Sequence, residues 1–191
     1  MRLFVALEIP AAVRDNLAAL IRELSKLSSP ATGKPPRWVR PENLHVTIKF
    51  IGETAPETLD AIRSALVQVR ANKPVDIECR GLGFFPDERH PQVLWAGLHA
   101  SANLPQLAEQ ADRALETVGV ASEKRTFTPH LTLARFNPPR LPETLGDAIT
   151  QAAARDFGSF QVREFHLIES KTKPSGAQYT TRHSFALRAE A

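Results

Sequence analysis

The sequence contains very little cysteine and no long apolar run. Cys79 is the only cysteine among 191 residues, so no disulfide can form within the chain, and this favours a reducing cytoplasm. No apolar stretch approaches the roughly 20 residues that a membrane-spanning helix needs. The opening MRLFVALEIP soon gives way to charged residues, so we interpret it as a first strand rather than a secretory signal. We therefore expect a cytoplasmic protein without membrane contact.

The charge balance is also modest. The chain has 24 Lys and Arg against 21 Asp and Glu, a net charge of +3. A basic balance can favour phosphate-bearing partners, but no run of Lys and Arg marks a nucleic-acid-binding arm. We interpret most charges as solvated surface. A hydrophobic content of 42% and a charged content of 24% are ordinary for a globular protein of this length.

A repeated order of predicted elements is the main organisational feature of the chain. Alternating or apolar segments predict strands, and apolar residues spaced by three and four predict helices. The first round has strands at 2–9, 44–52 and 75–85 with helices at 11–27 and 56–70, and a proline-rich loop at 28–43. The second has strands at 92–98, 130–136 and 160–170 with helices at 104–119 and 141–153.

The spacing between the two rounds is nearly constant. His130 follows His45 by 85 residues (130 − 45), and Phe160 follows Val75 by 85 residues (160 − 75). This spacing predicts one domain over 1–191 made of two similar lobes. The sequence repeats span approximately 1–86 and 91–172, and a closing strand at 178–187 follows them.

Both rounds contain His-x-Thr within a predicted strand, in LHVTIKF at 44–50 and in FTPHLTLARF at 127–136. Side chains alternate between the faces of a strand. His45, Thr47 and Lys49 should therefore share one face, and the apolar residues between them the other. His130 and Thr132 should be arranged in the same way. If the lobes are related by an approximate two-fold axis, each offers one imidazole and one hydroxyl to a shared cleft.

Two imidazoles on opposite sides of a bound group can act as general acid and general base, because histidine titrates near neutrality. The hydroxyls can donate hydrogen bonds to phosphate oxygens, which stabilises a transferring phosphoryl group without a metal. A single His-x-Thr is usually structural, but two copies at matching positions favour a site. Metal binding is the other alternative. It is disfavoured because catalytic zinc usually takes three protein ligands and no carboxylate or cysteine adjoins either histidine.

The paired motifs HVTI and HLTL, with RLFVALEIP, GLGFFPDERHPQVLWAGL and ESKTKPSGAQYT around them, resemble the 2H phosphoesterases. The similarity is to RNA 2′,3′-cyclic phosphodiesterases, also called 2′-5′ RNA ligases, and it covers essentially the whole chain. The resemblance implies a bilobal α+β fold with pseudo-two-fold duplication. Two mainly antiparallel sheets, flanked by helices, would enclose a central cleft.

The resemblance also implies an activity. The enzyme would hydrolyse RNA 2′,3′-cyclic phosphate ends to 2′-phosphates without a metal or other cofactor, and reversible 2′-5′ ligation stays open. The family pattern makes His45 the proton donor and His130 the proton acceptor, with Thr47 and Thr132 on the non-bridging oxygens. The expected partner is an RNA end such as a tRNA fragment, and the expected assembly is a monomer.

Three further residues are candidates for substrate binding. Lys49 shares the predicted face of His45. Arg135 lies five residues after His130, so strict alternation turns it away and only a bulge or a strand end would bring it to the phosphate. Its family position nevertheless favours contact. Phe85 could stack on a base, as could Phe84 and Trp38, although for these residues we favour core packing or loop anchoring.

Two other functions stay open. The lobes could bind or join RNA ends with little hydrolysis, or the same chemistry could act on a small cyclic nucleotide or an ADP-ribose cyclic phosphate. Turnover of a cyclic-phosphate oligonucleotide separates the first of these from a hydrolase. Relative rates on the small substrates separate the second.

Overall fold

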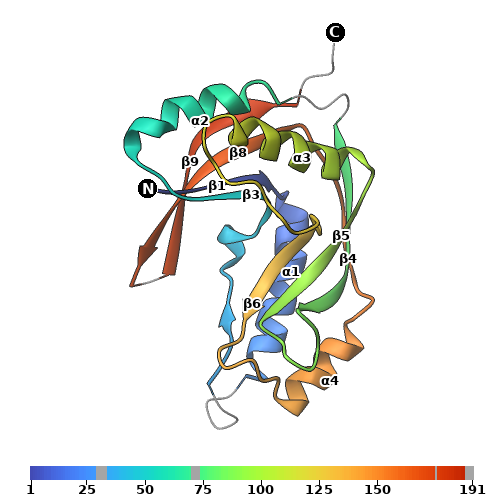
Figure 1. Ribbon diagram of the computed structural model, residues 1–191. Coiled ribbons are helices and arrows are strands. Elements are labelled where there is room, and N and C mark those ends of the chain that lie inside the picture. The colour runs from blue at the N-terminus through green and yellow to red at the C-terminus, as the bar shows by residue number, and fades with distance from the viewer. Residues whose placement is uncertain (29–33, 70–73, 175, 188–191) are drawn as a thin grey trace.

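The computed structural model describes residues 1–28, 34–69, 74–174 and 176–187, which form two antiparallel sheets with helices on their outer faces (Figure 1). The first sheet has the order β3-β1-β8-β9, from His45–Glu53, Arg2–Glu8, Glu164–Lys173 and Gly176–Ala186. The second has the order β2-β6-β5-β4-β7, from Arg37–Trp38, His130–Arg135, Val93–Ala100, Val75–Phe85 and Asp156–Val162. The predicted α+β class with two antiparallel sheets is confirmed.

The helices cover one face of each sheet. They are α1 (Ala11–Ser25), α2 (Leu59–Leu66), α3 (Asn103–Glu116) and α4 (Glu143–Gln151), with 3-10 turns η2 (Pro41–Asn43) and η3 (Pro56–Thr58). Helices α2 and α3 lie over the first sheet, and α1 and α4 lie against the second (Figure 1). Within the described residues, no helix is long and apolar enough to cross a membrane.

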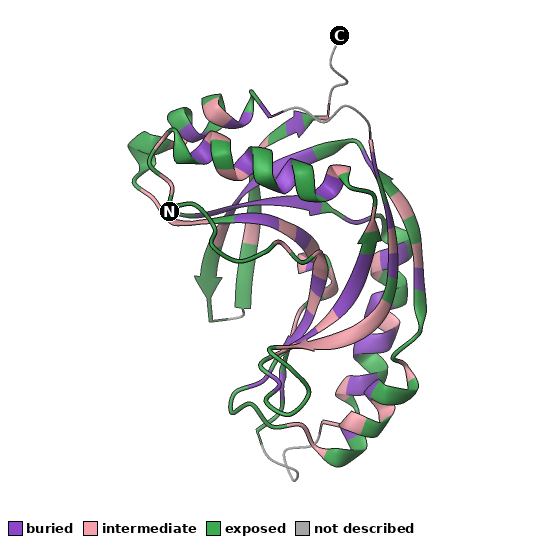
Figure 2. Cartoon of the chain, turned by 45° about the vertical axis from the view of Figure 1, so that its right-hand side comes forward, coloured by how far each residue is buried: buried purple, intermediate pink, exposed green. Residues whose placement is uncertain are grey.

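The two sheets exchange strands between the halves of the sequence. Strand β4, from the first half, pairs with β5 and β7, whereas β8, from the second half, pairs with β1. The order β3-β1-β8 in one sheet therefore corresponds to β6-β5-β4 in the other. Most buried apolar side chains of both sheets belong to one hydrophobic core, and both sheets contain buried residues (Figure 2). Phe4, Ala6 and Ile168 form a second, smaller cluster on the other face of the first sheet. The larger core fixes β3 and β6 relative to each other.

Two predicted elements differ from the structure. The predicted loop 28–43 contains β2 and η2, while 29–33 lie outside the described residues, as does residue 70 of the predicted helix 56–70. Prolines on both sides limit β2 to two residues, and an edge strand tolerates such flanks. The predicted strand 160–170 is divided at Arg163 into the end of β7 and the start of β8.

Candidate active site

The two predicted histidines lie close together at the point where β3 and β6 approach each other. Strand β3 begins at His45 and β6 begins at His130, and both imidazoles are half-buried. The charge of His130 acts on the pKa of His45, which requires the two rings to be neighbours. Thr47 and Thr132 are also half-buried, each two residues further along its strand.

Each imidazole is held by the same backbone contact. Nδ1 of His45 lies 2.7 Å from the carbonyl oxygen of Asn43, and Nδ1 of His130 lies 2.7 Å from that of Thr128. A carbonyl oxygen only accepts, so Nδ1–H donates in both cases. In the neutral ring this leaves Nε2 with a free lone pair, and in the charged ring it leaves an Nε2–H. Both rings can therefore exchange a proton through Nε2.

Burial lowers the pKa of both imidazoles below the ordinary value of 6.5, because the charged form loses hydration. The hydrogen bonds to the backbone carbonyls favour the charged form and oppose this effect. The positive charge of Arg135 lowers both pKa values, and His130 lowers that of His45 further. These effects favour the neutral form of both rings at pH 7. A bound anion would raise both pKa values again.

Aromatic rings surround the two histidines unequally. His45 has two such neighbours, Phe4 at 4.8 Å and Tyr179 at 5.2 Å between ring centroids. His130 has Phe85, edge-on at 4.9 Å, and the ring of Phe85 lies 5.3 Å from that of Trp95. These contacts fix the imidazole planes and exclude water from one side of each ring.

The prediction that Lys49 faces the cleft is wrong. Opposite β1, Thr47 pairs with Ala6 and Lys49 pairs with Val5, so Ile48 is an extra residue in β3. This bulge reverses the alternation after Thr47. The side chain of Lys49 consequently points into the protein and is only 5% exposed.

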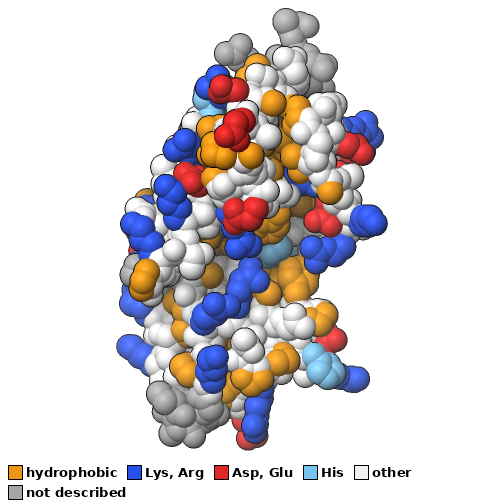
Figure 3. All heavy atoms as spheres, turned by 60° about the vertical axis from the view of Figure 1, so that its left-hand side comes forward, with side chains coloured by type: hydrophobic (Ala, Val, Ile, Leu, Met, Phe, Trp, Pro, Cys, Tyr) orange, Lys and Arg blue, Asp and Glu red, His pale blue; other side chains and the backbone are white. Residues whose placement is uncertain are grey.

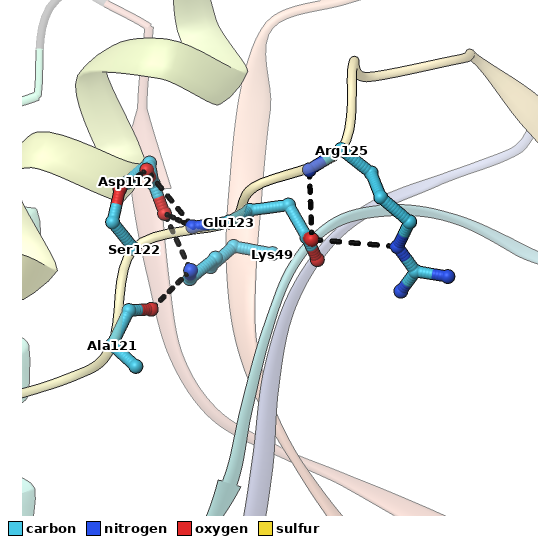
Figure 4. Close-up of polar contacts among 6 residues, drawn as sticks. All are labelled: Lys49, Asp112, Ala121, Ser122, Glu123 and Arg125. Carbon is cyan, nitrogen blue, oxygen red and sulfur yellow. Dashed lines mark hydrogen bonds and ion pairs between the residues drawn. The ribbon is translucent and has the colours of Figure 1, made fainter.

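Lys49 instead joins β3 to the segment that leads into β6. Its ammonium group forms an ion pair with Asp112 of α3 and donates a hydrogen bond to the carbonyl oxygen of Ala121 at 2.6 Å (Figure 4). Asp112 also accepts from the hydroxyl of Ser122 and the backbone N–H of Glu123. Burial alone would raise the pKa of Asp112, but these bonds outweigh it and hold that pKa below its ordinary value.

The bulge that Arg135 requires is present. In β6, Thr132 pairs with Trp95 and Ala134 pairs with Leu94, so Leu133 is an extra residue. The alternation is reversed after Leu133, and Arg135 is exposed on the side of His130. Its charge acts on the pKa of both imidazoles and of Tyr179. Arg135 is therefore near both histidines.

The three aromatic candidates have different surroundings in the structure. Phe85 contacts His130, whereas Phe84 packs toward Phe136 with the ring centroids 6.2 Å apart. Trp38 is packed against the hydrophobic core. Phe85 is thus the one of the three that lies beside a predicted catalytic residue.

Sequence reasoning missed two aromatic residues at this site. Tyr179 lies in β9, far from either motif in sequence, and it reaches His45 only because β9 joins the first sheet. Trp95 pairs with Thr132 across β5 and β6. A side chain built on Gly83 would collide with the Trp95 indole at 2.3 Å, so this glycine makes room for the ring. The available sequence signal was that both residues lie in segments that resemble the family, ESKTKPSGAQYT and GLGFFPDERHPQVLWAGL.

One face of the molecule is hollowed. In Figure 3 a histidine side chain is visible in a hollow between two masses of the molecule, with Lys and Arg side chains gathered beside it. Across the described residues, no group of three or more His, Cys, Asp and Glu side chains is placed to hold a metal ion. Two imidazoles beside an arginine and two hydroxyls can carry out proton transfer next to a bound anion.

Known proteins with similar sequences cover nearly the whole chain. The model of the 2′-5′ RNA ligase superfamily matches residues 13–174. The RNA 2′,3′-cyclic phosphodiesterase of Archaeoglobus fulgidus is 33% identical over 179 residues, which cover 94% of this chain and 96% of the relative. The enzyme of the same name from Thermus thermophilus is 35% identical over 200 residues, covering 100% and 92%.

Solved structures show the same fold. The protein TT0787 of Thermus thermophilus superposes with a TM-score of 0.81 at 30% identity, covering 100% of both chains. Escherichia coli LigT complexed with 3′-AMP superposes with a TM-score of 0.76 at 26% identity, covering 97% of both chains. The predicted resemblance is confirmed over the full length of the chain.

Proposed function

The chain belongs to the 2′-5′ RNA ligase superfamily, and from this membership we propose that it hydrolyses RNA 2′,3′-cyclic phosphate ends to 2′-phosphomonoesters. Relatives that are 30–35% identical over most of the chain are named RNA 2′,3′-cyclic phosphodiesterases, which makes it an enzyme of this class. The observation that carries the mechanism is the matched pair of imidazoles, each with Nδ1–H bonded to a backbone carbonyl and Nε2 available.

His130 and His45 divide the proton transfers between them. Nε2 of neutral His130 removes a proton from water, and the water oxygen forms a bond to phosphorus. The bond from phosphorus to the 3′-oxygen breaks, and Nε2–H of charged His45 donates its proton to that oxygen. The phosphate stays on the 2′-oxygen, and the protons have moved from His45 to product and from water to His130.

Three groups stabilise the charge on the phosphate during this step. The hydroxyls of Thr47 and Thr132 donate to the non-bridging oxygens from opposite sheets, and the guanidinium of Arg135 pairs with one of them. The phosphate charge also raises the pKa of His45, which keeps the acid protonated in the complex. Phe85, beside His130, offers its ring to the terminal base.

The reaction needs few groups beyond the two histidines and the residues that bind the phosphate. A five-membered cyclic phosphate is strained and its leaving group stays attached, so positioning and proton transfer supply most of the catalysis. General acid–base catalysis contributes roughly 10²–10⁴-fold. We propose that no metal takes part.

The direct test is turnover of an oligonucleotide that ends in a 2′,3′-cyclic phosphate, with and without a chelator. Phosphorus NMR should show a 2′-phosphate and no 3′-phosphate, at the same rate in both conditions. A 3′-phosphate product would exclude the assigned leaving group. Activity lost on chelation and restored by a divalent cation would replace the metal-free mechanism. Binding without any turnover would leave the RNA-end-binding function.

Ligation would use the same site with a different attacking group. A 5′-hydroxyl of a second RNA takes the place of water, so attack at phosphorus forms a 2′-5′ linkage, and the family description favours this second activity. We propose tRNA fragments as one source of such ends. The single 1–191 domain with two similar lobes, the monomeric state and the cytoplasmic location are likewise proposals. Sedimentation and cell fractionation test the last two.

A further inference from the structure

The edge of the second sheet carries two arginines directly opposite each other. Strand β2 pairs with β6 so that Arg37 faces Arg135 and Trp38 faces Ala134. Residues opposite each other in a ladder point to the same face. Because Trp38 packs on the core, the exposed side chain of Arg37 lies on the same side as Arg135 and the histidines.

This arrangement costs stability in the empty protein. Like charges directly opposite in an antiparallel pair repel each other. Among the residues that the structure describes, no carboxylate forms an ion pair with either guanidinium, whereas other arginines, such as Arg80 and Arg155, have one. Two facing arginines that pair with no described carboxylate can therefore bind phosphate groups.

The two arginines lie at different distances from the histidines. Arg135 acts on both imidazoles, whereas Arg37 lies one strand further out, on the edge strand β2. An RNA whose terminal phosphate lies between His45 and His130 would pass its preceding phosphodiester along this edge. Figure 3 shows several Lys and Arg side chains beside the hollow in which a histidine is visible.

We propose that Arg37 binds the phosphodiester on the 5′ side of the terminal nucleotide, next to the terminal phosphate that Arg135 binds. The inference rests on the proposed function and specifies its substrate. The subsite favours an oligonucleotide over a cyclic mononucleotide, because the mononucleotide lacks that phosphodiester. The terminal phosphate contacts the histidines and Arg135, and the next phosphate contacts Arg37.

The test compares a dinucleotide ending in a 2′,3′-cyclic phosphate with the cyclic mononucleotide of the same terminal base. Arg37→Gln should lower kcat/KM for the dinucleotide about tenfold more than for the mononucleotide. Arg63→Gln, which removes the same charge from α2, should leave the ratio at its wild-type value. An Arg37→Gln variant with the wild-type ratio overturns the subsite.

Two further measurements separate this inference from the proposed function. Binding of a dinucleotide ending in a 2′-phosphate should weaken in Arg37→Gln, and the slope of log K against log salt should fall by about 0.7, as for one lost contact on a single strand. An unchanged slope overturns the subsite even if the enzyme turns over no substrate. The melting temperature of the free variant should stay level or rise, since a repulsion is removed. A clear fall would assign Arg37 a structural role instead.

Discussion

Strands β3 and β6 have the same pattern of burial over their first six residues, although they belong to different sheets. In each, the histidine and the threonine are half-buried, the residues at positions two, four and five are buried, and the sixth is exposed. Both strands gain an extra residue at position four, where β1 and β5 shift register. The backbone therefore presents positions one, three and six to the cleft in both sheets.

The side chains at positions five and six make the two strands chemically different. Position five is Lys49 in β3 and Ala134 in β6, and position six is Phe50 in β3 and Arg135 in β6. Phe50 is 57% exposed, and its ring lies 6.3 Å from that of Phe4. One side of the cleft is thus aromatic at this position and the other is cationic. The two histidines and two threonines follow the symmetry, whereas the arginine that we propose to bind the phosphate does not.

The largest expected effect concerns the residues that the two strands share. His45→Ala and His130→Ala should each reduce kcat about 10²–10⁴-fold, since each removes one proton-transfer group. The residual activity should differ in pH dependence. The His130→Ala variant should lose the acid limb of the profile, which reports the base, and the His45→Ala variant should lose the alkaline limb. Rates measured across roughly pH 4–9 test both expectations.

A suitable control for the histidine variants is His183→Gln. His183 contacts Phe185 and pairs with Leu167, so it lies on the helix side of the first sheet, away from the cleft. Its replacement should leave kcat near the wild-type value. A wild-type rate in either catalytic variant would contradict the paired mechanism.

Lys49→Met removes the buried cation of β3, which has no counterpart in β6 because Ala134 occupies the equivalent position. The side chain of Asp112 is only 19% exposed and would lose its partner, and breaking a buried ion pair in this way costs about 3–5 kcal/mol. Urea unfolding measures the loss. The free energy of unfolding should fall by more than the activation free energy of the catalysed reaction rises. The reason is that Lys49 contacts neither histidine.

The matched control is Lys49→Met with Asp112→Asn, in which no charge stays unpaired and most of the loss should be recovered. The pH dependence gives an independent check. Because the pKa of Asp112 is depressed in the folded protein, its contribution is present above the unfolded value of about 3.9 and is lost as pH falls through the folded value. Lys49→Met should flatten this dependence. Equal slopes in both proteins would argue against the ion pair.

Arg135→Gln makes the second strand uncharged at position six, like the first. Losing a charged hydrogen bond to the phosphate costs about 1.5–3 kcal/mol, so kcat/KM should fall about 10- to 100-fold. The pKa of both histidines should rise, because a nearby positive charge that lowers them is gone. The pH optimum of kcat/KM should therefore move from the acid side of 6.5 to higher pH.

Arg135→Lys distinguishes the effect of the positive charge from that of the planar guanidinium group, since it keeps the charge and removes that group. It should keep the pH optimum while losing part of the affinity, since an ammonium cannot bind an oxygen pair bidentately. An Arg135→Gln profile that stays at the wild-type pH would mean that Arg135 does not act on the imidazoles.

Period-two alternation was enough to predict the symmetric part of this site. The positions of His45, Thr47, His130 and Thr132 require only that each motif begins a strand with its apolar residues inward. The repeated order of elements predicted two similar lobes, and the family resemblance implied the α+β class. Tyr179 required knowing that β9 joins the first sheet, which is a long-range pairing without a local sequence signal.

The two β-bulges explain why the orientations of Lys49 and Arg135, which differ between the two strands, could not be predicted from the sequence. Ile48 and Leu133 are apolar residues within apolar strands, so nothing in their identity marks them as extra residues. One uncounted residue reverses every later side chain, which turned Lys49 inward and Arg135 toward the cleft. Strand β2 was missed because prolines around a two-residue segment predict a loop equally well.

The smallest effect tests the aromatic side of the comparison. Phe85→Leu keeps an apolar side chain but removes the ring beside His130, so a terminal base that stacks there should lose about 1 kcal/mol, or about fivefold in KM, with little change in kcat. Phe84→Leu is the matched control, because its ring packs toward Phe136. That variant should lose stability and keep its KM. If both variants changed KM equally, or Phe85→Leu changed only kcat, Phe85 would orient His130 rather than bind the base.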